Sequence, residues 1–189
     1  RQLTTGLGKK YTMLNSATKN HPSVFFAHAP IDVVNCLVEE HGIDVKNISK
    51  IVVKMGSNLS LVTNDHSPEG EVDAQFSVPY QVAVSLLEPD EGPKWYSDKT
   101  LSNPEILQLA RRVTSVFDRE ADNLFITTGE SMVKGEIITK DKKVYRKNLP
   151  STKIVSTPDE YRRKFSKIAA QVLPQDHTSR ILRIIDNIE

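Results

Sequence analysis

Helix patterns lie toward the two ends of the chain and strand patterns lie between them, and this order is what most constrains the fold. Apolar residues recur at three- and four-residue spacing over 28–41, and Gly42 follows where that helix would end. Residues 48–55 alternate and are rich in β-branched side chains, so they predict a strand. The order favours an α+β domain of two layers, in which a mainly antiparallel sheet is covered by helices on one face.

The rest of the chain continues this mixture of helices and strands. Asn103-Pro104 predicts a helix start, since a capping residue precedes a proline, and Thr157 with Glu160 has the spacing of a capping box. We expect the α+β domain to cover residues 1–156 and the C-terminal helices to cover 157–189, where they close the domain or pack on a missing helical domain. The other predicted elements are a helix at 76–87 and strands at 113–118, 123–128, 133–139 and 143–148.

Composition excludes several classes of protein. The 189 residues carry a net charge of +1, too little basic excess for a dedicated nucleic-acid binder. No apolar run reaches the ~18 residues of a membrane span, so we expect no membrane partner. The one cysteine, Cys36, forms no internal disulfide. We therefore expect a reducing compartment, the cytoplasm, or the mitochondrion if the chain is eukaryotic.

Generic catalytic motifs give no assignment. The chain has no glycine-rich phosphate loop, no GxSxG elbow and no histidine pair at metal-ligand spacing. Polar residues do gather where two helices are predicted to begin: Lys19, Ser23 and His28 before and at the first, and Tyr80 at the second. Backbone N–H groups and the positive dipole end of a helix, with a nearby lysine, favour a carboxylate ligand.

Three segments follow a known order of motifs. Residues 19–32, KNHPSVFFAHAPID, are similar to a pattern of lysine, aromatic residue, proline, cysteine or serine, and then a histidine at the head of a helix. Residues 73–84, DAQFSVPYQVAV, are similar to an A-x-F-S-x-P-Y-x-V-A-x-A/V signature, and residues 48–53 to an I-x-x-I-x-V strand. In this order and separation the segments resemble the MmgE/PrpD family, over nearly the whole chain.

The resemblance implies a lyase or isomerase of citrate-like acids, such as 2-methylcitrate dehydratase, cis-aconitate decarboxylase or iminodisuccinate epimerase. Such enzymes move a proton at a carbon beside a carboxylate, generally without a metal, so no cofactor and no metal are expected. Family chains are longer, with a helical domain first, an α+β lid second and the active site between them. The expected partners are a small di- or tricarboxylic acid and a helical domain or subunit of the same family, in a homo- or hetero-oligomer.

The resemblance also implies roles for single residues. Lys19 falls on the lysine that binds a substrate carboxylate, with Ser23 and His28 beside it as binding residues, and Tyr80 falls on a tyrosine that faces the same cleft as a catalytic donor. Val24 stands where some decarboxylases of the family have histidine and others cysteine or an acid, so that contact is lost. The base would lie on the absent helical domain, and the chain alone would be inactive.

A second interpretation stays open from the residues themselves. Without the resemblance, Lys19 would be a solvated surface lysine, Tyr80 a core tyrosine and His28 a helix cap. The chain would then be a lid-like binding or assembly module without chemistry of its own. In either case we interpret His21 as a surface residue and Arg162-Arg163-Lys164 as a solvated helix flank.

Overall fold

A computed structural model describes residues 6, 8, 9, 11, 19–88, 90–128, 132–150 and 157–188. Its strands form one sheet in the order β2-β1-β3-β4. β1 is parallel to β2 and antiparallel to β3, and β3 and β4 form an antiparallel hairpin. The strands are β1 (Ile48–Met55), β2 (Val113–Phe117), β3 (Met132–Thr139) and β4 (Val144–Pro150).

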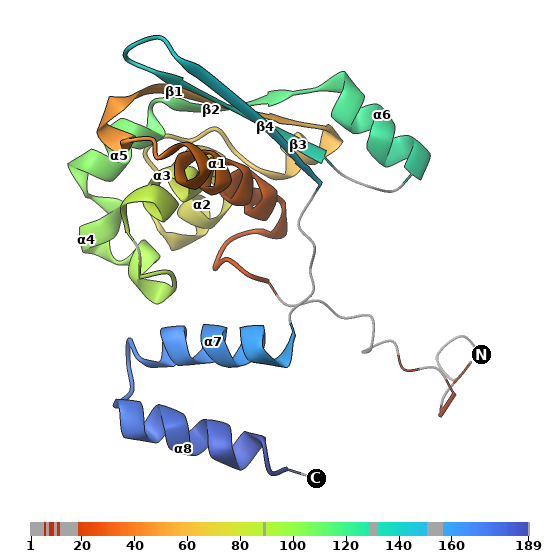
Figure 1. The fold of residues 1–189 in the computed structure, drawn as a ribbon, viewed down its shortest axis with the longest axis vertical. Helices are drawn as coiled ribbons and strands as arrows, with labels where there is room; N and C mark the ends of the chain where they lie inside the picture. Colours follow the sequence, from red (N-terminus) through yellow and green to blue (C-terminus); the bar gives the residue numbers. More distant parts are fainter. Residues whose placement is uncertain are drawn as a thin grey trace.

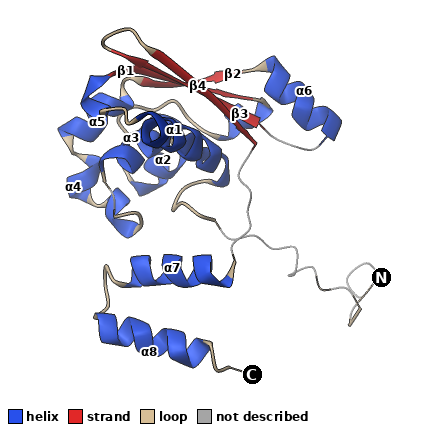
Figure 2. Cartoon of the chain, in the orientation of Figure 1, coloured by secondary structure: helices blue, strands red, loops and turns tan. Residues whose placement is uncertain are grey.

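Helices α1 to α5 lie on one face of this sheet and α6 lies beyond its end, so the predicted α+β class is confirmed (Figures 1 and 2). The α-helices are α1 (His28–His41), α2 (Glu71–Phe76), α3 (Val78–Leu87), α4 (Asp98–Leu101), α5 (Pro104–Ala110), α6 (Arg119–Thr128), α7 (Pro158–Ala169) and α8 (Gln175–Ile185). Short 3-10 helices are η3 (Phe25–Ala27), η4 (Val45–Asn47), η5 (Ser57–Leu61) and η6 (Pro93–Tyr96).

The helix α1 packs closely on the centre of the sheet. Its apolar side, with Val33 and Leu37 fully buried, faces β3. Gly135 of β3 makes this approach possible, because a Cβ atom there would lie 2.9 Å from a Val33 methyl carbon. As predicted, α1 ends at Gly42, whose φ of 57° is a left-handed conformation that glycine adopts readily.

Two predicted elements are wrong. Residues 123–128, predicted as a strand, belong to the helix α6, because the Asp118 carboxylate accepts from the Ala121 N–H (2.9 Å) and caps that helix. The predicted helix 76–87 does not begin at Phe76. It is interrupted at Ser77, which pairs with Thr63 in a short bridge and whose side chain caps α3.

The helices α7 and α8 form an antiparallel pair on the side of the helical layer that faces away from the sheet (Figure 1). Thr157 and Glu160 make the predicted capping box at the start of α7. The predicted division of the chain at 156/157 borders residues 151–156, which lie outside the described residues. Within the described part of the chain, no helix has the length and apolar character needed to cross a membrane.

Candidate functional site

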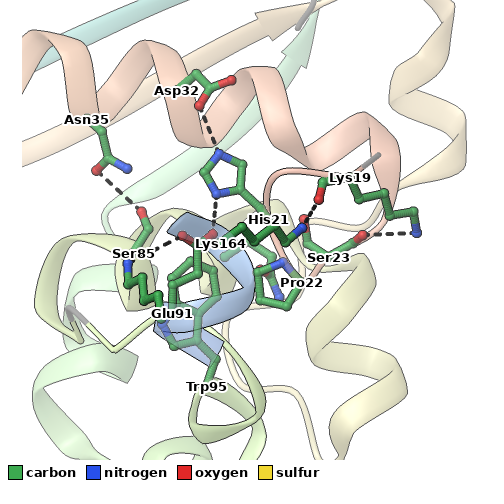
Figure 3. A network of polar contacts seen from close by, with 12 residues as sticks. Lys19, His21, Pro22, Ser23, Asp32, Asn35, Ser85, Glu91, Trp95 and Lys164 are labelled. Atoms are coloured by element: carbon green, nitrogen blue, oxygen red, sulfur yellow. Dashed lines mark hydrogen bonds and ion pairs between the residues drawn. The ribbon is translucent and has the colours of Figure 1, made fainter. Parts of the chain in front are cut away.

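The segment 19–24 lies between the start of α1, the turn after α3 and the helix α7 (Figure 3). Val24 donates its N–H to the Gln75 carbonyl (3.1 Å), and the Tyr96 hydroxyl donates to the Pro22 carbonyl. The Lys164 ammonium of α7 donates to the Lys19 carbonyl. Three separate parts of the chain therefore hold this segment in place.

Lys19 and Ser23 contact one another within this segment. The Lys19 ammonium donates to the Ser23 carbonyl at 3.2 Å, while the Lys19 side chain remains exposed. Ser23 is 3% exposed, and its hydroxyl donates to the Val24 carbonyl at 3.3 Å. Of the two, only the Lys19 ammonium is both charged and open to solvent, which suits it to meet an anion.

His28 begins α1 and is buried, at 1% exposure. Its ring lies 5.1 Å from the His21 ring and 5.7 Å from the Phe25 ring, measured between centroids. Burial, together with the neighbouring His21 charge, lowers the pKa of His28 to about 4, so the ring is neutral at pH 7. Its Nε2 is buried without a hydrogen-bond partner among the described residues, which is uncommon for a buried polar atom.

His21 is held between two carboxylates, which corrects its interpretation as a surface residue. Its Nε2 lies 2.8 Å from an Asp32 oxygen of α1, and its Nδ1 binds Glu91 in the turn after α3. Its side chain is only 13% exposed. Because a carboxylate accepts and does not donate, two such bonds require a proton on both ring nitrogens, so the ring is an imidazolium.

The electrostatics agree with this geometry. Burial lowers the pKa of His21, but hydrogen bonds and charge from Asp32 and Glu91 outweigh it and raise the pKa to about 9. The imidazolium then lowers the pKa of the adjacent His28. The two neighbouring histidines therefore differ in charge at neutral pH, one positive and one neutral.

Tyr80 is placed in the core beside the site. It is fully buried, and its hydroxyl donates to the Trp95 carbonyl. Burial, and secondarily Tyr96, raises its pKa above the usual range of a phenol, so it stays protonated. Its neighbour in sequence, Gln81, donates to the Tyr96 hydroxyl at 3.0 Å. Tyr80 is thus linked to the segment 19–24 through η6, and its hydroxyl is already occupied.

The structure brings three of the four predicted residues, Lys19, Ser23 and His28, into one short segment, and Tyr80 adjoins it from the core. The sequence analysis did not single out Glu91 and Asp32, and it placed Lys164 on a solvated flank, whereas Lys164 is half-buried against Lys19. Nothing in the sequence signals the pairing of His21 with a carboxylate 70 positions away.

Within the described ranges, no group of three or more histidine, cysteine, aspartate or glutamate side chains is arranged to hold a metal ion. The groups at this site are the exposed Lys19 ammonium, the neutral His28 ring, and the His21 imidazolium, whose charge is balanced by Asp32 and Glu91. Such a set suits the binding of an anionic small molecule.

Comparison with known proteins identifies the domain. The model of the MmgE/PrpD C-terminal domain matches residues 21–189, most of the chain, beginning two residues after Lys19. No curated protein matches the chain. The matched range contains the α+β layers and both C-terminal helices. The chain therefore belongs to the MmgE/PrpD family, and residues 21–189 are its C-terminal domain.

Proposed function

We propose that this domain is the lid of a lyase or isomerase that removes a proton next to a carboxylate of a citrate-like di- or tricarboxylic acid. MmgE/PrpD is a family of lyases whose members also have an N-terminal domain. The observation that carries the proposal is the segment 19–28, which presents an open ammonium beside a buried neutral imidazole.

Lys19 would bind a substrate carboxylate. Within the described part of the chain, the hydrogen bond of its ammonium goes to a neutral backbone carbonyl, that of Ser23, which a carboxylate could replace with a stronger, charge-assisted bond. His28 would support the same site from within the core, since its ring is 1% exposed and its Nε2 has no hydrogen-bond partner among the described residues. Ser23 shapes the same turn through its carbonyl.

The role of Tyr80 as a catalytic donor remains a prediction, and it requires that the Tyr80 hydroxyl change its hydrogen-bond partner. Its hydroxyl would have to leave the Trp95 carbonyl and reach the substrate. If it does, Tyr80→Phe lowers kcat more than it raises KM, because a donor that meets developing charge acts in the transition state. If it does not, the variant loses about 1 kcal/mol of unfolding free energy and keeps its kcat.

The proton-abstracting base would come from a helical domain of the same family, as a second domain or subunit. The exposed side of the C-terminal helices supports such a partner. Val172 is 75% exposed, Ile184 56% and Ile188 71%, although all three are large and apolar. A helical domain packed on these helices would bury such exposed apolar side chains.

The experiment compares the chain alone with the chain assembled with a family helical domain from the same genome. Dehydration of 2-methylcitrate and decarboxylation of cis-aconitate would be measured for both. We expect turnover only in the assembly, since a carboxylate clamp without a base does not accelerate proton removal. Turnover by the chain alone would refute the proposal that the base lies on a separate helical domain.

Lys19→Ala in the active assembly tests the binding residue. Loss of a charge-assisted bond of roughly 1.5–3 kcal/mol predicts a ten- to hundredfold weaker affinity for the acid. Lys99→Ala, on the exposed surface of α4, is the matched control and should change nothing. If the assembly has no activity but the domain still binds its partner, the chain is a binding or assembly module, as the apolar Val24 would allow.

A further inference from the structure

A cavity of about 320 Å³ lies between the segment 19–24 and the helix α7. Asn20, Pro22 and Glu91 line one side of it, and Arg163, Lys164 and Lys167 line the other. The volume lies at the lower end of the range for small-molecule sites, which suits a metabolite. The cavity is distinct from the position of the Lys19 ammonium, which extends away from Lys164 toward Ser23 (Figure 3).

The two carboxylates in the cavity wall, those of Glu91 and Glu160, already have hydrogen-bond or ion-pair partners. One oxygen of Glu91 binds the His21 imidazolium, and the other lies 3.7 Å from the Lys167 ammonium. Glu160 accepts from the Thr157 N–H at 2.6 Å and from its hydroxyl at 3.2 Å, in the capping box of α7. Both carboxylates therefore already have partners, and the wall carries one cation more than it has carboxylates: Arg163, Lys164 and Lys167 against Glu91 and Glu160.

Two cations on α7 form no ion pair with an acidic side chain among the described residues. The Lys164 ammonium donates to the Lys19 carbonyl, a neutral group, and the Arg163 guanidinium has no acidic partner among the described residues. Partial burial lowers the pKa of Lys164, and the nearby Glu91 charge only partly opposes this. An ammonium that has lost water without gaining a carboxylate is stabilised by a bound anion.

We propose that this cavity binds one carboxylate of a small polycarboxylic acid through Lys164 and Arg163. The guanidinium offers two parallel N–H donors to the carboxylate, and the Lys164 ammonium offers a point charge beside them. The choice of a polycarboxylic acid rests on the proposed function. The site would hold a carboxylate on the opposite side of the segment 19–24 from Lys19, and it makes α7 part of the binding surface.

The test is isothermal titration of citrate into the chain and its variants. We expect Lys164→Gln to weaken citrate binding at least tenfold and Arg163→Gln severalfold, while Lys99→Gln on α4 leaves it unchanged. Lys164→Arg, which keeps the charge, should retain most of the affinity. Arg163 is exposed, so its variant tests the cavity even if a change at the half-buried Lys164 disturbs folding.

The Lys19→Gln variant distinguishes a failure of the cavity site from a failure of the proposed role of Lys19. If Lys19→Gln weakens citrate binding but neither α7 variant does, the cavity site is refuted and the Lys19 site stands. If the α7 variants weaken binding and Lys19→Gln does not, the cavity site is supported and the Lys19 role fails. Absence of citrate binding at millimolar concentration, or inorganic phosphate that binds as tightly as citrate, would overturn the assignment to a polycarboxylic acid.

Discussion

Replacing His21 by glutamine should destabilise the domain at neutral pH and have little effect at high pH. The imidazolium joins α1 to the turn after α3 through Asp32 and Glu91. Glutamine keeps a polar side chain but carries no charge, so the two carboxylates lose the positive charge that lies between them. The substitution therefore removes an ion-paired link between segments that are distant in the chain.

The size of the effect follows from the pKa. Raising the pKa of His21 from 6.5 to about 9 corresponds to roughly 3 kcal/mol, at about 1.4 kcal/mol per pKa unit. Because the folded pKa is the higher one, this stabilisation is fully present below pH 6.5 and is lost as the pH rises through 9. With the side chain only 13% exposed, solvent screening removes little of it.

Urea unfolding at pH 6 and pH 10 measures the effect. We expect the unfolding free energies of wild type and His21→Gln to differ by about 3 kcal/mol at pH 6 and to converge at pH 10. His177→Gln is the matched control, because that side chain is 60% exposed and its substitution should change stability by less than about 0.5 kcal/mol at either pH.

Two results would refute this reasoning. The first is a difference between wild type and His21→Gln that is the same at both pH values, since a packing loss alone does not titrate. The second is direct: an NMR titration in which the His21 ring changes charge at or below pH 6.5 would show that the carboxylates do not hold its proton.

Two further predictions concern the packing of the sheet and the start of α3. Gly135→Ala should lower the unfolding free energy by about 1–3 kcal/mol, because the new methyl group would meet the Val33 side chain at 2.9–3.0 Å; an unchanged urea midpoint would contradict this close contact. Ser77→Ala should cost about 1 kcal/mol, since its hydroxyl oxygen accepts from the Tyr80 N–H at 3.0 Å, and thermal unfolding that matches wild type would show that the cap is dispensable.

Local signals explain which elements were predicted well. The bounds of α1, the Asn103 cap of α5 and the capping box of α7 all depend on residues within a few positions of each other. Residues 123–128 were misassigned because a short apolar run has no clear period, and the informative residue, Asp118, lies five positions before it. The Asp118 carboxylate favours a helix here, because it accepts a hydrogen bond from the Ala121 N–H group in the first turn.

In the candidate site, too, residues close in the sequence could be predicted together and long-range contacts could not. Lys19, Ser23 and His28 lie within ten positions, so any fold that begins a helix at His28 keeps them near one another, and the sequence could place them together. The contact of Tyr80 with the Trp95 carbonyl could not be predicted, because it depends on where η6 lies against α3. Because of this contact, the Tyr80 hydroxyl, a candidate donor to substrate, already donates a hydrogen bond to a backbone carbonyl.

The α+β class, the family motifs and the candidate anion-binding segment could be predicted from the sequence, since they depend on periodicity and on residues close in the chain. The charged groups around that segment come together only when the chain folds. The bond between Lys164 and Lys19 spans 145 positions, and the one between His21 and Glu91 spans 70. Coulombic and hydrogen-bond energies depend on distance in space, and for residues so far apart in the chain that distance is fixed only when the helices pack.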